Sequence, residues 1–484
     1  MRIDEAVVDK AAARCRERGI RIPTFAQMRD PQLVPESTRS ALAQVGMQDV
    51  DPLNLFRITW KNEPLESGGG FNDGNWIEFP AQLTQVEARI IGLVGKWFPT
   101  GAHKVGAGFG CLVPRLVSGH FDPTAHKAVW PSTGNFCRGG TFDCALLGCD
   151  SVAILPEEMS RERFEWLRAL GAEVIATRGS ESNVKEIYDA CWEIRRTRPE
   201  CVIFNQFEEF GNAIWHYHVT GGTLEEIFRR VASPRQRLAA FVSATGSAGT
   251  LAAGDFLRSV HPHVRITAVE ALQCPTLLEC GFGGHRIEGI GDKHVPWIHN
   301  VRNTDLVCAI DDERCIALMR LFNEPEGQCW MAGEGIGDEF ISTQLPLLGI
   351  SSICNLVASI KTARLYDLGR DDVVFTVLTD SMDLYRSRVQ EQREQRGAYS
   401  AQLAARTFGR HIEAISTDHL RELTYRERKR IHNLKYFTWV EQQQRSVDEL
   451  QRLWDPDFWC ETYLQVEEWE RLIDAFNSRV ALLA

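Results

Sequence analysis

Lys104 is the residue whose type and surroundings most clearly suggest chemistry. It closes the segment Phe98-Pro-Thr-Gly-Ala-His-Lys104, where a loop of small residues runs into an expected helix. A lysine at such a junction can form an imine with an aldehyde when burial lowers the pKa of its ammonium group. Lys104 is therefore a candidate to bind the aldehyde of pyridoxal phosphate (PLP). A lysine beside glycines is more often a solvated loop residue, so the interpretation depends on other segments.

Three further segments place small polar residues directly after an expected strand. Residues 130–140 (Trp-Pro-Ser-Thr-Gly-Asn-Phe-Cys-Arg-Gly-Gly) precede an expected helix at 141–148, and residues 241–250 (Phe-Val-Ser-Ala-Thr-Gly-Ser-Ala-Gly-Thr) have the same strand-loop-helix form. Backbone N–H groups at helix starts attract anions, so the first loop suits a carboxylate and the second a phosphate. The β-branched strand 373–381 ends in Asp-Ser, where a hydroxyl can face a ring nitrogen. One such turn is more often structural, but four in this order favour a single PLP site.

Together these segments resemble the fold-type II PLP-dependent enzymes, the group of cysteine synthase, cystathionine β-synthase and tryptophan synthase β-subunit. Thr100-Gly-Ala-His-Lys104 resembles the tryptophan synthase lysine motif, and Ser132-Thr-Gly-Asn135 resembles the substrate loop of cysteine synthase. Gly246-Ser-Ala-Gly-Thr250 resembles the family's phosphate loop, and Thr379-Asp-Ser381 its pyridine-nitrogen segment. Residues 155–160, 167–174 and 204–207 resemble cystathionine β-synthase. The resemblance covers roughly residues 50–390.

The resemblance implies a set of site residues. Lys104 would be the catalytic and cofactor-bound lysine, and Asn135 would hydrogen-bond the O3′ atom of PLP. The implied cofactor-binding residues are Lys104, Asn135, Gly246, Ser247, Ala248, Gly249, Thr250 and Ser381. The implied substrate-binding residues are Ser132, Thr133, Gly134, Gln206 and Arg138.

Departures from the family pattern bear on the substrate. Ala248 stands where the phosphate loop has glycine, which is tolerable if its φ stays negative. Arg138 adds a cation near the substrate loop: it binds an anionic side chain or leaving group, or it pairs with an acid on the surface, the interpretation slightly favoured here. The segment Glu288-Gly-Ile-Gly-Asp-Lys-His294 carries ionisable residues where the family has small and apolar ones.

The implied reaction is PLP-dependent β-replacement on a serine- or cysteine-type amino acid, through an aminoacrylate intermediate that a thiol or other nucleophile converts to a β-substituted alanine. The first alternative is a β-eliminating lyase of the dehydratase, desulfhydrase or ammonia-lyase type. The second is a catalytically silent relative that uses the fold as a scaffold. Ser381 at the ring nitrogen would favour loss of a β-leaving group, whereas a carboxylate from Asp380 there would ease racemase-like chemistry. The donor, the leaving group and the nucleophile stay open.

Short apolar strands alternate with helical patterns from about residue 85 to 390, which predicts an α/β fold with parallel-rich sheets covered by helices. The expected strands are 54–60, 127–130, 151–155, 173–176, 201–204, 240–243, 265–269 and 373–377. The expected domains are a helical segment 1–50, a large PLP-binding domain 51–112 and 232–390, a small mobile substrate-loop domain 113–231, and a helical extension 391–484.

That extension is rich in Arg, Glu and Gln, then in tryptophan, and lacks glycine after Gly409, so we expect helices throughout. We expect it to pack on the catalytic body or on a dimer partner and to set access or oligomeric state.

Composition limits the partners. A net charge of −11 leaves no positive excess for nucleic acid, and no apolar run is long enough for a membrane span. The fourteen cysteines form no Cys-x-x-Cys pair, and neither His216/His218 nor His261/His263 completes a metal site. Residues 1–18 lack the apolar core of a secretion signal. We therefore expect reduced thiols and a cytoplasmic location. The family resemblance implies a homodimer that acts on a small amino acid.

Overall fold

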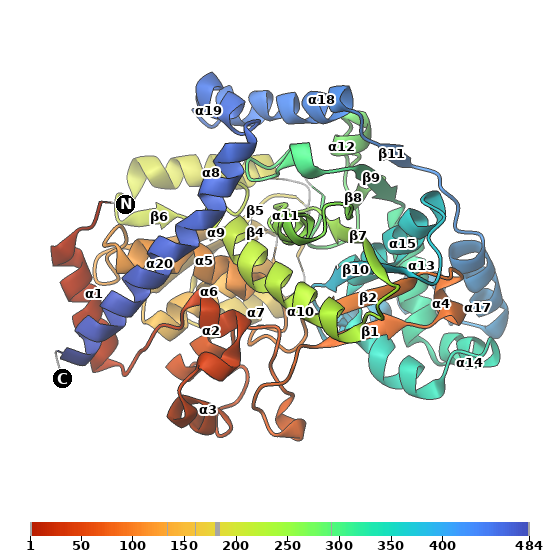
Figure 1. Ribbon diagram of the computed structural model, residues 1–484, viewed down its shortest axis with the longest axis horizontal. Helices are drawn as coiled ribbons and strands as arrows, with labels where there is room; N and C mark the ends of the chain where they lie inside the picture. The colour runs from red at the N-terminus through yellow and green to blue at the C-terminus, as the bar shows by residue number, and fades with distance from the viewer. Residues whose placement is uncertain (1, 133, 160, 180–183, 292, 483–484) are drawn as a thin grey trace.

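The structure is a computed structural model of the chain and describes residues 2–132, 134–159, 161–179, 184–291 and 293–482. Its strands form a seven-stranded sheet of order β1-β2-β10-β7-β8-β9-β11 and a four-stranded sheet of order β5-β4-β3-β6 (Figure 1). The strands are β1 Trp76–Phe79, β2 Arg89–Val94, β3 Lys127–Pro131, β4 Asp150–Pro156, β5 Glu173–Thr177, β6 Cys201–Ile203, β7 Arg237–Ala244, β8 Arg265–Ala271, β9 Leu306–Ile310, β10 Asp372–Leu378 and β11 Leu420–Glu422.

The inner strands of both sheets are parallel. All pairs of the small sheet are parallel, and in the large sheet only the edge strands β1 and β11 pair antiparallel with their neighbours. Every residue of β10 is buried, as a parallel strand covered on both faces requires. The predicted α/β architecture is therefore confirmed.

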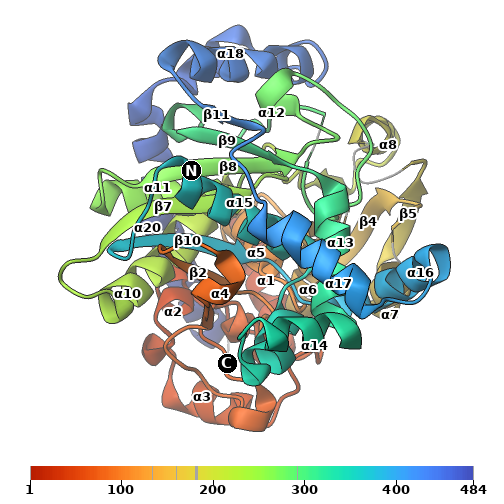
Figure 2. The same ribbon diagram turned by 90° about the vertical axis from the view of Figure 1, so that its right-hand side faces the viewer.

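Helices cover both sheets (Figures 1 and 2). The α-helices are α1 Glu5–Glu17, α2 Phe25–Arg29, α3 Glu36–Leu42, α4 Ala81–Thr84, α5 Lys104–Val117, α6 Asn135–Leu147, α7 Arg161–Ala169, α8 Val184–Thr197, α9 Phe210–Trp215, α10 Gly222–Val231, α11 Leu251–Val260, α12 Thr276–Glu279, α13 Asp312–Asn323, α14 Pro325–Gly333, α15 Ile350–Leu365, α16 Arg386–Arg396, α17 Ala401–Phe408, α18 Tyr425–Lys435, α19 Val447–Arg452 and α20 Pro456–Leu482.

Two expected elements were wrong. The expected strand 54–60 is largely a 3-10 helix, Pro52–Arg57, because Asp51 caps it by accepting a hydrogen bond from the backbone N–H of Leu53 at 2.9 Å. The buried guanidinium of Arg57 then holds this turn by donating to the carbonyls of Leu42 and Gly69. The extension is helical but not throughout, since β11 pairs with β9 and adds an edge to the large sheet. The expected domain division stays a prediction.

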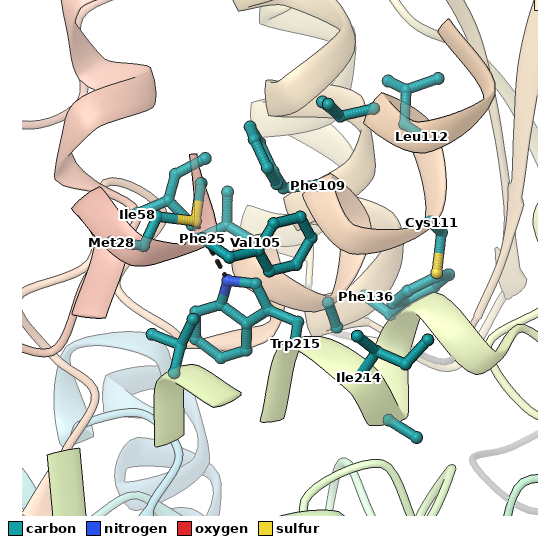
Figure 3. Packing of buried hydrophobic residues seen from close by; sticks show 14 of the residues in the cluster. Phe25, Met28, Ile58, Val105, Phe109, Cys111, Leu112, Phe136, Ile214 and Trp215 are labelled. Carbon is teal, nitrogen blue, oxygen red and sulfur yellow. Dashed lines mark hydrogen bonds between the residues drawn. The ribbon is translucent and has the colours of Figure 1, made fainter. Parts of the chain in front are cut away.

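Glycines in α5 allow the core beneath the lysine motif to pack closely. A Cβ on Gly106 would lie 2.1 Å from the Trp215 ring, and one on Gly110 would lie 2.4 Å from the carbonyl oxygen of Gly211, so α5 and α9 approach each other directly. Trp215 also donates from Nε1 to Met28 Sδ at 3.3 Å (Figure 3). Helix α5, which starts at Lys104, is therefore fixed by a rigid apolar contact.

The fourteen cysteines are free. Across the described ranges, no single helix is long and apolar enough to cross a membrane, although the bent pair 340–347 and 350–365 meets the length and composition test.

Candidate functional site

The structure brings Lys104 to the loop expected to bind phosphate. A Cβ on Gly246 would lie 3.6 Å from Lys104 Nζ and 2.8 Å from the carbonyl oxygen of Gly289. Glycine at 246 therefore lets the loop pass close to the Gly289 carbonyl, with the Lys104 amine beside it. Lys104 is half-buried rather than fully buried.

The loop 245–250 between β7 and α11 is held by hydrogen bonds from both sides. Thr245 donates from its backbone N–H and its hydroxyl to the carbonyl of Val269 on β8, at 2.7 and 2.9 Å. On the other side, Asn212 Nδ2 donates to Ser247 Oγ at 2.9 Å and to the carbonyl of Gln206 at 3.1 Å. Asn212 thus connects the phosphate loop with the substrate-side segment. No sequence pattern indicated Asn212, because an asparagine inside a short helix has no distinctive spacing.

Ala248 adopts a φ of +65°, so the negative φ that would make alanine tolerable at this position is not present. The left-handed conformation closes the turn into α11, whose residue Leu251 donates to the Ala248 carbonyl at 3.1 Å. For a residue with a Cβ this conformation costs about 1–2 kcal/mol. Burial of the methyl group beside Leu251 and Ile266 offsets part of that cost.

The substrate loop follows β3 and runs into α6. Ser132 Oγ accepts hydrogen bonds from Gln206 Nε2 and from the backbone N–H of Gly134, both at 3.2 Å. Two residues expected to hold the substrate carboxylate are therefore adjacent, although they are far apart in the sequence. Thr133, expected beside them, lies outside the described residues.

Asn135 contacts Asp380, not Ser381. Asn135 Nδ2 donates to Asp380 Oδ2 at 2.7 Å, and the Tyr385 hydroxyl donates to the same oxygen at 2.9 Å. Burial raises the pKa of Asp380, while the hydrogen bond from Asn135 opposes that rise. The Ser381 hydroxyl instead donates to Asp383 Oδ2 at 3.2 Å. The role of Ser381 at the ring nitrogen stays a prediction.

Arg138 is buried, so its interpretation as a surface ion-pairing residue was wrong. It is 4% exposed, and its guanidinium carbon lies 4.5 Å from the centre of the Trp166 ring. The reason lies in the glycines that follow it. A Cβ on Gly139 would lie 2.7 Å from the backbone of Val105, and one on Gly140 would lie 2.2 Å from Trp130. Helix α6 is therefore drawn against α5, which turns Arg138 inward.

A second buried arginine, missed in the sequence, lies beside the substrate loop. Arg163 Nη2 lies 3.1 Å from Glu288 Oε2, and both side chains are under a tenth exposed. Glu288 also accepts from Arg388 Nε of α16, at 2.8 Å. Arg163 gave no signal because Arg161-Glu-Arg163 has the composition of a solvent-facing helix.

The other ionisable residues after Glu288 lie elsewhere. His294 Nε2 is 3.0 Å from the Tyr188 hydroxyl, and the Lys293 ammonium is 5.9 Å from the Phe282 ring centre. Asp292 is not among the described residues.

Known proteins resemble this chain in sequence and in fold. A family model described as "Pyridoxal-phosphate dependent enzyme" matches residues 98–332. The chain is 30% identical over 262 residues to a cysteine synthase of Staphylococcus aureus, covering 54% of this chain and 75% of that protein. It is 28% identical over 290 residues to a probable cysteine synthase of Bacillus subtilis, covering 60% and 85%. The solved O-acetylserine-dependent cystathionine beta-synthase from Helicobacter pylori has a TM-score of 0.55 and 23% identity, covering 65% of this chain and 94% of that one.

Proposed function

Because the chain belongs to the fold-type II pyridoxal-phosphate-dependent enzymes, we propose that it catalyses β-replacement on a serine- or cysteine-type amino acid, giving a β-substituted alanine. The observation that carries the proposal is the position of Lys104 Nζ in front of Gly246. An amine facing a phosphate loop suits a cofactor that has an aldehyde and a phosphate.

The residues around Lys104 fit PLP, the cofactor of this family. Gly246 and Gly249 have no room for a side chain, since a Cβ at 246 would lie 2.8 Å from the Gly289 carbonyl oxygen and one at 249 would lie 2.0 Å from Asn212 Oδ1. The backbone of this small-residue loop can therefore approach a phosphate closely. The amide oxygens of Asn135 and Gln206 are buried without a hydrogen-bond partner among the described residues. Such polar groups suit a polar ligand, because an unpaired buried oxygen is costly.

When bound, PLP withdraws electrons from the α-carbon of an amino acid. We propose that Ser132 and Gln206 bind the substrate carboxylate, since their side chains already contact each other. Lys104 then lies within the same site to move the proton at the α-carbon. Asn135 holds the cofactor ring, and Asp380 fixes the Asn135 amide through the 2.7 Å hydrogen bond.

The test supplies the purified holoenzyme with O-acetyl-L-serine and sulfide and identifies products by mass spectrometry. We expect cysteine, visible absorption from the lysine-bound cofactor, and loss of both in the Lys104→Ala variant. Lys127→Ala, which changes a lysine at the far end of β3, is the control. Pyruvate and ammonia in place of cysteine would establish the eliminating alternative. Protein that takes up no PLP would refute both reactions and leave the scaffold alternative.

Three further points extend the proposal: the assembly and the mobile domain rest on the family resemblance, and the location rests on the sequence. We propose that the protein is a homodimer in the cytoplasm. Light scattering of the purified protein in solution tests the proposed dimer. We also propose that residues 113–231 form the mobile small domain, which hydrogen exchange with and without substrate tests.

A further inference from the structure

We propose that Arg138 and Arg163 form a second anion subsite beside the substrate loop. A reactant of the enzyme would then carry a carboxylate or phosphate in addition to its α-carboxylate, either on the leaving group of the donor or on the nucleophile. The inference rests on the proposed β-replacement and names the substrate class of that same site.

Arg138 supplies the first cation. It lies one turn after Asn135 on α6, so both side chains lie on the same side of that helix. Its Nε and Nη1 atoms are buried and have no acceptor among the described residues. Burial lowers the pKa of Arg138 to about 10, with Arg163 as the next cause, and the guanidinium therefore stays charged at neutral pH. A buried charge without an acceptor is strongly unfavourable.

Arg163 supplies the second cation and contacts the substrate loop itself. Its Nη1 atom lies 2.3 Å from the position of a Cβ on Gly134, so the guanidinium occupies the space that any side chain at 134 would fill. Its side chain is 3% exposed. Arg163 and Arg138 repel each other across this site. An anion between them would remove that repulsion and bind both planar groups.

The neighbouring acids balance these charges only in part, although Asp380 attracts both arginines. Glu288 is shared between Arg163 and Arg388, at 3.1 and 2.8 Å. Asp380 accepts from Asn135 and Tyr385. Arg138 therefore keeps donors for a ligand from outside the protein. The α-carboxylate has its own place at Ser132 and Gln206, so the anion at the two arginines belongs to another part of a reactant.

The first test measures binding of L-aspartate, L-asparagine and L-alanine to the holoenzyme by titration calorimetry. All three have the same α-carboxylate and lack a β-leaving group, but only aspartate carries a second anion. We expect aspartate to bind at least tenfold more tightly than asparagine. Arg138→Gln should abolish that difference, and Arg138→Lys, which keeps the charge, should restore part of it. Arg168→Gln, an exposed arginine of α7, should keep the full difference.

A second arm separates the two sources of the anion. A lower KM for O-phospho-L-serine than for O-acetyl-L-serine, lost in Arg138→Gln, would place the anion on the leaving group. A lower KM for 3-mercaptopropionate than for 2-mercaptoethanol, lost in the same variant, would place it on the nucleophile.

Equal affinities for aspartate and asparagine in the wild-type enzyme would overturn the subsite while leaving β-replacement intact. The subsite would also be overturned if Arg138→Gln weakened alanine as much as aspartate, because that result marks a structural role. If no amino acid binds and no PLP is retained, the proposed function fails and the subsite fails with it.

Discussion

Asp143 is a buried carboxyl group that makes folding of this enzyme sensitive to pH. It lies on α6 against α5, where its Oδ2 atom is 2.5 Å from the position of a Cβ on Gly108. Both carboxyl oxygens are buried without a hydrogen-bond partner among the described residues. Burial raises the pKa of Asp143 well above its ordinary value. The folded state therefore favours the protonated form.

The sign and size of the effect follow from proton linkage. Between the unfolded and folded pKa values, the folded state binds the extra proton, so the free energy of unfolding falls as pH rises, by about 1.4 kcal/mol per pH unit. Below the unfolded pKa of Asp, about 3.9, this cost disappears. Asp143→Asn removes the titration while keeping the shape of the side chain. We expect the stability of the variant relative to the wild-type enzyme to rise with pH above the unfolded pKa, at up to about 1.4 kcal/mol per pH unit.

Urea unfolding of the holoenzyme at pH 5, 6 and 7 measures this difference, with Asp150→Asn at an exposed position of β4 as the control. The two proteins should have similar stability near pH 4, and their stabilities should diverge steadily above it. A difference between variant and wild type that does not change with pH would refute the reasoning. It would mean that Asp143 is charged and paired in the folded enzyme.

Three other substitutions test separate contacts. Gly246→Ala places a Cβ 2.8 Å from the Gly289 carbonyl oxygen, so the loop must shift. We expect the affinity for PLP, measured by equilibrium dialysis, to fall more than tenfold. An unchanged affinity would contradict the position of the loop. Arg388→Ala removes a partly exposed ion pair to Glu288 that is worth about 0.5–1 kcal/mol, so hydrogen exchange in α16 should become faster. Arg386→Ala, which removes an exposed ion pair to Asp383, is the control and should leave the exchange rate unchanged. Trp469→Ala opens a cavity beside Phe25 and should lower the free energy of unfolding by about 3–5 kcal/mol in urea titrations; a change below 1 kcal/mol would show that α20 does not pack there.

The sheets were predictable because their signal is local. Residues 127–130, 265–269 and 373–377 are short, largely apolar runs, and each lies inside an observed strand. The loops that carry the chemistry were predictable for the same reason, because each directly follows a strand. Loops at the carboxyl ends of parallel strands meet at one edge of the sheet. In contrast, the segment 54–60 has the composition of a strand, but the Asp51-Pro52 cap before it starts a 3-10 helix instead.

The contacts inside the site could not be predicted, because they depend on side-chain directions that a local sequence pattern does not indicate. Asp380 and Ser381 are neighbours, yet only Asp380 turns toward Asn135, which is 245 positions away in the chain. The sequence favoured a surface position for Arg138, because arginine is usually exposed. Its burial depends on packing between helices, which a local pattern does not indicate. Its inward direction follows from the absence of side chains at Gly139 and Gly140, which became visible only once α5 and α6 were placed.

The first and last helices of the chain complete one core together. Val8, Ala11, Ala12 and Cys15 of α1 share their apolar cluster with residues of α20, and Arg479 forms ion pairs with Glu5 and Asp9. Helices α1 and α20 lie side by side in Figure 1. During synthesis on the ribosome, the apolar face of α1 therefore stays uncovered until residues 456–482 have been made. Such long-range closure slows folding and leaves apolar surface exposed in the growing chain. Until α20 has emerged, the apolar face of α1 is thus expected to be open to aggregation.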